Sequence, residues 1–196
     1  AFRCTIVGGD TVRTAGPGFV SLSLAGILSG KPWLRSGARA GDRLVLAGTL
    51  GMSAAGLALF QAGKGAPRDA LGAHRRPRPP QELAASLRAL GTAVHAAIDI
   101  SDGLSSECHH LALASGVRIE LDRAALPVSP SVTRAARLLG ASPLPWLLDG
   151  GEEHSLLACV SPKATLPVGA REIGCVVAGR GVWIRSGSDA AFEPLP

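Results

Sequence analysis

The sequence has 196 residues, a formal net charge of +5 and 46% hydrophobic residues, which is enough apolar material to bury the core of one domain. Aromatic residues make up only 4%, with no tyrosine, so the positive charge lacks the aromatic partners of a nucleic-acid-binding surface. No apolar run approaches the roughly 18 residues of a membrane span, and the first residues lack the pattern of a signal peptide.

The beginning of the chain predicts two strands, at residues 3–8 and 19–27, separated by the turn-rich TAGPG. The sequence lacks an initial methionine and enters a strand almost at once, which indicates a chain that starts inside a domain. A Gly-Lys-Pro break at 30–32 precedes the polar loop LRSGARAGD at 34–42. This loop is the predicted domain boundary.

The next segment predicts a buried strand at 43–48, a small-residue helix at 53–62, a loop at 63–80 and a helix at 81–90. The loop contains the basic run HRRPRPP, which is typical of an exposed connection. Contact with an anionic ligand is the alternative for this run. The glycines of LAGTLGMSAAG do not have the spacing of a dinucleotide-binding motif, so close packing of the helix on its strand is the better interpretation.

The remaining chain alternates strands with helices, which predicts an α+β fold, a mixed β-sheet layered with helices. The predicted strands lie at 94–98, 117–121, 154–160, 171–178 and 181–185, and the helices at 102–115, ended by Gly116, and near 130–139. The four cysteines are scattered without a zinc-binding spacing, so buried thiols in a reducing cytoplasm are expected.

The stretch AAIDISDGL ends an apolar strand in two aspartates, Asp99 and Asp102, with Ser101 between them. One interpretation is that Ser101 or Asp102 is only the N-cap of the next helix. The other is a site for a cation, a phosphate or both, to which the helix N-terminus would add its positive dipole.

Acidic residues and glycines follow two further strand-like segments, in TIVGGD and WLLDGGEE. Strand ends of such sheets tend to meet at one edge, and gathered carboxylates repel one another unless a cation neutralises them. Mg²⁺ suits such a site, because it binds a few carboxylates together with phosphate oxygens. Ordinary acidic turns are the alternative. The residues concerned are Asp10, Asp99, Asp102, Asp149, Glu152 and Glu153.

The order of five motifs resembles the thiamine-monophosphate kinase family, within the aminoimidazole ribonucleotide synthetase-like superfamily. The motifs are GGDT at 8–11, LRSGARAGD at 34–42, GTLGMSAAGL at 48–57, IDISDGL at 98–104 and GGEEHSL at 150–156. The resemblance implies that residues 31–196 form the C-terminal domain of that fold. It also implies that residues 1–30 are a remnant, the last strands, of an N-terminal ATP- and metal-binding domain, so that the chain is truncated.

The resemblance further implies an enzyme that phosphorylates thiamine phosphate to thiamine diphosphate with ATP and Mg²⁺. ATP and thiamine phosphate would be its partners, without nucleic acid or membrane, in a cytoplasmic protein that is a homodimer at full length. Transferred by position, Gly9, Asp10, Arg35 and Ser101 would bind ATP. Asp10, Asp99 and Asp102 would bind the metal, and Glu152 would bind thiamine phosphate.

Two motifs depart from the family pattern. Met52 stands where the family usually has aspartate, and Glu153, His154 and Ser155 replace Asp, Tyr and Glu after the retained Glu152. The alternatives are therefore another ATP-using member of the superfamily, similar to selenophosphate synthetase or aminoimidazole ribonucleotide synthetase, and a non-catalytic nucleotide-binding remnant. A basic nucleic-acid-binding module is the last candidate.

Overall fold

The computed structural model describes residues 4–28, 30–187 and 190–196, in two units, Ala1–Pro32 and Trp33–Pro196. In the first unit, residues 4–28 contain neither helix nor strand, so the strands predicted at 3–8 and 19–27 are wrong for the described residues, and residue 3 lies outside them. A strand is stable only when its backbone N–H and C=O groups pair with a neighbour, and residues 4–28 have no such ladder.

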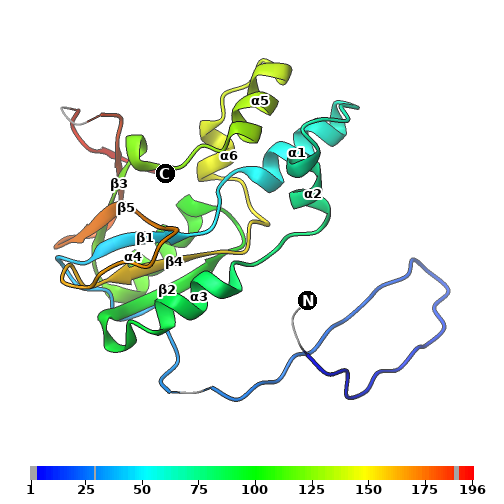
Figure 1. Ribbon diagram of the computed structural model, residues 1–196, viewed down its shortest axis with the longest axis horizontal. Coiled ribbons are helices and arrows are strands. Elements are labelled where there is room, and N and C mark those ends of the chain that lie inside the picture. The colour runs from blue at the N-terminus through cyan, green and yellow to red at the C-terminus, as the bar shows by residue number, and fades with distance from the viewer. Residues whose placement is uncertain (1–3, 29, 188–189) are drawn as a thin grey trace. The chain divides into compact units, whose positions relative to one another are not determined.

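The second unit is built on a seven-stranded mixed sheet with the order β2-β4-β1-β5-β3-β6-β7 (Figure 1). All neighbouring pairs are antiparallel except β3 and β6, which are parallel. The strands are β1 Arg43–Ala47, β2 Val94–Ile100, β3 Arg118–Asp122, β4 Ser155–Val160, β5 Ala170–Val177, β6 Gly181–Arg185 and β7 Glu193–Pro194.

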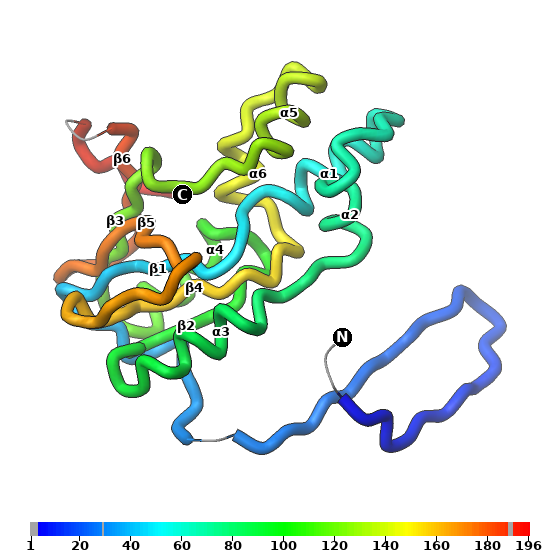
Figure 2. Tube along the Cα trace, viewed as in Figure 1, coloured from blue at the N-terminus to red at the C-terminus, as the bar shows by residue number. Residues whose placement is uncertain are grey.

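Helices pack against the sheet and beyond one end of its strands. In Figures 1 and 2, α1, α2, α5 and α6 lie together past the ends of β1 and β4, whereas α4 packs on β2, β3 and β6. The helices are α1 Met52–Gln61, α2 Arg68–Arg75, α3 Gln81–Arg88, α4 Leu104–Ser115, α5 Pro130–Leu139 and α6 Leu144–Leu148, with 3-10 turns at Gly91–Ala93 and Arg123–Ala125. The predicted α+β class is confirmed.

Side chains of the central strands alternate between two apolar clusters, as the two-residue period of a strand requires. Leu44 and Leu46 of β1 join the large core, whereas Val45 between them joins the smaller cluster on the opposite face. In β2, Ile98 and Ile100 point into the large core, so Asp99 between them is left exposed at the end of the strand. The alternation therefore places a carboxylate where the sheet meets solvent.

Three elements were not predicted. Helix α2 falls in the segment 63–80 that the sequence indicated as a loop, and α6 and β7 were not expected. Gly56 of α1 faces the Ala70 carbonyl of α2 so closely that a side chain there would collide with it. The small residues of α1 therefore serve contact with α2, whereas the sequence suggested contact with a strand. Among the described residues, no helix has the length and hydropathy needed to cross a bilayer.

Candidate functional site

The ends of β2 and β4 bring two of the three acidic segments together. The Ser101 carbonyl accepts the Glu152 N–H at 2.6 Å, and the Ile100 carbonyl accepts the His154 N–H at 2.8 Å. These bonds extend the antiparallel ladder in which Ile100 faces Ser155. The segment 99–102 and the turn 150–154 are thus neighbours along the backbone. We call this place the β2–β4 junction.

Two glycines allow the backbones of the junction to come so close. A Cβ atom at Gly151 would lie 2.5 Å from the Ser101 oxygen, and one at Gly103 would lie 2.9 Å from the Leu148 oxygen. Gly103 also has φ 120°, a conformation that side chains rarely adopt. The sequence suggested that the glycines make room for a ligand. In the structure they make room for the neighbouring backbone.

The turn 150–154 is held in an unfavourable conformation. Glu152 has φ 63° and His154 has φ 51°, both in the left-handed region that residues with a Cβ avoid. Such strain persists only where the surroundings impose it, and it is concentrated at functional sites. Here the two backbone hydrogen bonds to β2 impose it. Glu152, the predicted acceptor-binding residue, is therefore positioned by the fold, with its side chain 74% exposed.

Asp99 and Asp102 are exposed, and Ser101 is half-buried between them. The capping interpretation is wrong, because the N-cap of α4 is Gly103 and no side chain caps that helix end. Glu107, which is 2% exposed, instead accepts the Ser101 hydroxyl at 3.3 Å and the Asp102 N–H at 3.4 Å. The two aspartates therefore have no role in forming the helix.

The junction offers fewer protein ligands than the complete shell of a Mg²⁺ ion requires. The described residues contain no group of three or more His, Cys, Asp or Glu side chains arranged to hold a metal. Asp99 and Asp102 nevertheless offer hard carboxylate oxygens at an open surface. This fits an ion that takes one or two carboxylates and completes its shell with water and phosphate oxygens.

Arg35 lies in the loop before β1, and its backbone is held by the last residue of α4. The Ser115 hydroxyl donates to the Arg35 carbonyl at 3.1 Å and accepts the Ala38 N–H at 3.1 Å. The Arg35 side chain is exposed and lines, with Asp99, an open cavity of about 680 Å³. A residue predicted to bind the nucleotide, Arg35, and one predicted to bind the metal, Asp99, thus border the same cavity.

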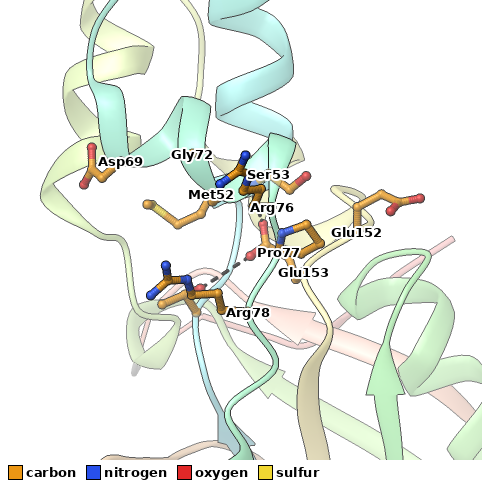
Figure 3. Close-up of a pocket in the computed structure, with 11 residues that line it drawn as sticks. Met52, Ser53, Asp69, Gly72, Arg76, Pro77, Arg78, Glu152 and Glu153 are labelled. Atoms are coloured by element: carbon orange, nitrogen blue, oxygen red, sulfur yellow. Dashed lines mark hydrogen bonds between the residues drawn. The ribbon is translucent and has the colours of Figure 1, made fainter. Parts of the chain in front are cut away.

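A second cavity of about 370 Å³ lies between the α1 N-terminus, the segment after α2 and the turn 150–154 (Figure 3). Its lining includes Glu152 and Glu153, and Figure 3 shows that the Glu152 side chain extends away from the others. Glu153 is 7% exposed and accepts the Ser53 N–H at 2.8 Å and the Thr49 hydroxyl at 3.4 Å. Burial raises the pKa of Glu153 to about 7 despite these bonds.

The remaining predicted residues, Gly9 and Asp10, lie in the first unit in exposed chain, where Asp10 accepts the N–H of Thr11 at 2.8 Å. Their contact with the junction stays a prediction. The sequence did not assign a role to Glu107, or to Arg76 and Arg78 in the second cavity, and it did not indicate that Glu153 is buried. Of these, the basic run around Arg76 and the acidic Glu153 gave a signal in the sequence.

Comparisons with known proteins agree with this architecture. The chain is 46% identical over 177 residues to a thiamine-monophosphate kinase of Mycobacterium tuberculosis, covering 89% of the chain and 51% of that protein. It is 34% identical to the kinase of that name from Rhodopirellula baltica, covering 94% and 55%. The chain thus spans about half the length of these relatives.

Solved structures show the same fold. The crystal structure of thiamine monophosphate kinase from Aquifex aeolicus matches with a TM-score of 0.73 and 32% identity, covering 83% of this chain and 55% of that one. Another match is AaThiL complexed with AMPPCP and TMP, with a TM-score of 0.69 and 32% identity, covering 80% and 52%. Residues 39–182 match the family model described as AIR synthase related protein, C-terminal domain. The chain belongs to this family of AIR synthase related proteins, whose C-terminal domain it contains.

Proposed function

We propose that this chain is part of a thiamine-monophosphate kinase, which transfers the γ-phosphate of ATP to thiamine phosphate. The observation that carries the proposal is the β2–β4 junction. There the segment 99–102, predicted to bind ATP and metal, lies beside the turn 150–154, predicted to bind the acceptor, and the Ser101 and Ile100 carbonyls accept backbone hydrogen bonds from that turn. The 46% identity to a kinase of that name supports it, as does the similarity to a structure complexed with AMPPCP and TMP.

Each predicted site residue has a role in this proposal. Gly9, Asp10, Arg35 and Ser101 contact ATP, and the planar guanidinium of Arg35 suits phosphate oxygens. Asp10, Asp99 and Asp102 hold Mg²⁺, while Glu152 binds thiamine phosphate beside them. The fixed backbone at Arg35 and Glu152 supports these roles, because a preorganised group loses little entropy when the ligand binds.

Catalysis in such a site consists mainly of positioning and charge stabilisation. Mg²⁺, which Asp10, Asp99 and Asp102 would hold, would supply positive charge that offsets the negative charge of the phosphates. The junction's own contribution is to keep donor and acceptor at a fixed separation, because β2 and β4 are rigid elements whose ends are bonded together. No side chain of the junction is assigned as a general base. The cytoplasmic location and the homodimer that the resemblance implies belong to the same proposal.

A second candidate is a different ATP-dependent activity within the family. It is favoured by the likeness to the hydrogenase maturation protein HypE of E. coli, with a TM-score of 0.65 and 26% identity. The two candidates differ in the acceptor. Thiamine diphosphate formation supports the first, whereas ADP release that ignores thiamine phosphate supports the second.

The proposal is tested by replacing the junction aspartates singly, Asp99→Asn and Asp102→Asn. Each change removes a charge that the cation needs but keeps the size of the side chain. We expect the dissociation constant for Mg²⁺-ATP, measured by titration calorimetry, to rise about tenfold or more, a loss of about 1.4 kcal/mol, with an unchanged melting temperature. Asp149→Asn is the matched control, because Asp149 is exposed on the neighbouring segment and the resemblance does not place it among the metal ligands. Equal affinity in all the variants would contradict the metal assignment.

A further inference from the structure

The second cavity contains a pair of arginines that no other part of the proposal uses. Arg76 and Arg78 are exposed, line the cavity together with Glu152, and flank Pro77 in Figure 3. These two cationic side chains lie beside the turn that is proposed to bind the acceptor. An anionic group of a ligand would neutralise them.

The fold anchors the start of this segment at the end of α2, and prolines restrict the rest of it. The Ser53 hydroxyl lies 3.3 Å from Nδ1 of His74, which fixes the last turn of α2 to the start of α1. The Arg76 N–H then donates to the Gly72 carbonyl at 2.9 Å. Prolines follow at 77, 79 and 80, and each proline ring restricts the backbone, so fewer conformations are lost when a ligand orders the two arginines.

The charges of the described cavity leave the two guanidinium groups available. Neither Arg76 nor Arg78 forms an ion pair with any described residue. The nearby carboxylates are directed elsewhere: Asp69 accepts the Ser131 hydroxyl, Glu153 accepts the Ser53 N–H, and Glu152 extends away from the arginines. Two cationic groups therefore line the cavity without an ion-pair partner among the described residues.

We propose that Arg76 and Arg78 bind the phosphate of the acceptor substrate, a phosphate monoester whose remaining part is an organic cation. This rests on the proposed function, because it assigns the acceptor to this cavity. Guanidinium groups donate paired hydrogen bonds to phosphate oxygens, so the arginines select the phosphorylated form of the acceptor over the free alcohol. The half-buried Met52 and Pro77 offer apolar contact to a ring, and Glu152 offers a charge opposite to that of the organic cation.

The test is calorimetric titration of the full 196-residue chain with thiamine phosphate and with thiamine, with inorganic phosphate as a third probe. We expect the chain to bind thiamine phosphate about tenfold more tightly than thiamine. The double substitution Arg76→Gln and Arg78→Gln should reduce this ratio to about one and weaken phosphate binding, while affinity for Mg²⁺-ATP stays unchanged. Lysine at both positions should restore part of the ratio, because charge returns without the paired geometry. Arg123→Gln, an exposed arginine outside the cavity lining, should change nothing.

The outcomes separate this inference from the proposed function. A ratio that survives the double glutamine variant overturns the inference, and so does a chain that binds thiamine phosphate no better than thiamine. If Mg²⁺-ATP binds in either of those cases, the kinase proposal still stands. If the arginine-dependent preference is found but Mg²⁺-ATP does not bind, the phosphate site is supported and the kinase proposal fails.

Discussion

The buried carboxylate of Glu153 makes the stability of the fold depend on pH. This carboxylate accepts the Ser53 N–H at the start of α1, where a negative charge is favourable. Its burial opposes ionisation more strongly, so the pKa of Glu153 rises to about 7 from an ordinary 4.5. The native protein therefore keeps this proton over a range in which the unfolded chain has already lost it.

The first prediction follows from that difference. Between pH 4.5 and about 7 the native state binds more protons at Glu153 than the unfolded state does, so the free energy of unfolding falls as the pH rises. The total loss is on the order of 3 kcal/mol, and it is complete above about pH 7. Urea unfolding of the chain and of Glu153→Gln, which cannot titrate, should give a difference curve that declines over this range. A flat or rising curve would contradict the burial argument.

Arg35 carries the second prediction. Lysine at this position keeps the charge but loses the planar arrangement of donors, so the affinity for Mg²⁺-ATP should fall about fivefold. Arg39→Lys is the control, because Arg39 is an exposed arginine of the same loop outside the cavity lining. If calorimetry shows equal affinities for the two variants, Arg35 does not contact the nucleotide.

Residue types and strand ends predicted part of the site. Asp99 and Asp102 follow a visible strand, and Glu152 precedes another, so their meeting at one edge could be expected. The sequence could not show that Glu107 reaches back to Asp102, because either residue type is also common at helix starts. The basic run around Arg76 was visible in the sequence, but its place in the second cavity was not. That place depends on α2 packing against α1, a contact between elements that the local pattern does not contain.

Among the elements, the turn 150–154 makes the third prediction. Glu152→Gly should relieve the left-handed conformation at φ 63°, which costs a residue with a Cβ about 1–2 kcal/mol. Glycine also increases the conformational entropy of the unfolded chain, which reduces this gain in stability by about 0.4–1 kcal/mol. The Gly variant should therefore unfold at a higher urea concentration than Glu152→Ala, although both lose the proposed acceptor contact.

Asp149, at φ −114°, provides the comparison for this turn. Glycine there relieves no strain, so Asp149→Gly should be less stable than Asp149→Ala by up to about 1 kcal/mol. If the Gly variant is less stable than the Ala variant at both positions, the backbone at Glu152 is not strained.

The sequence predicted best the elements whose own residues carry a clear signal, either an apolar run or a glycine that ends a helix. Strands β1 and β4 have continuous apolar runs. Helix α4 is followed by Gly116, whose φ of 67° suits the residue that terminates a helix. Helix α2 was missed because its eight residues follow a proline and contain a glycine, both of which indicate a loop. Its stability comes from buried Ala70 and Leu71 and not from its propensity.

For the whole molecule, the fourth prediction concerns the two units. Residues 4–28 have no helix or strand, and Phe19, Leu22 and Leu24 there are exposed, whereas the chain from Trp33 onward has a continuous core. Brief digestion with a broad-specificity protease should cut before Trp33 and leave the remainder intact. Mass spectrometry of the product measures the cut site, and a cooperative urea transition of the purified product shows that it folds alone. Early cuts inside β1 or β4 would contradict the division into units.

The backbone bonds between Ser101 and Glu152 have a consequence for evolution and protein engineering. Because Gly103 and Gly151 leave no space between the two segments, neither can shift without displacing the other. Under the proposed function, a change of nucleotide preference made through β2 would therefore disturb the proposed acceptor side, and a change of acceptor made through the turn before β4 would disturb the proposed nucleotide side. A new specificity in this fold has to come from side chains outside the β2–β4 junction. The segment after α2 is an example, because its residues can change without moving the backbone of the junction.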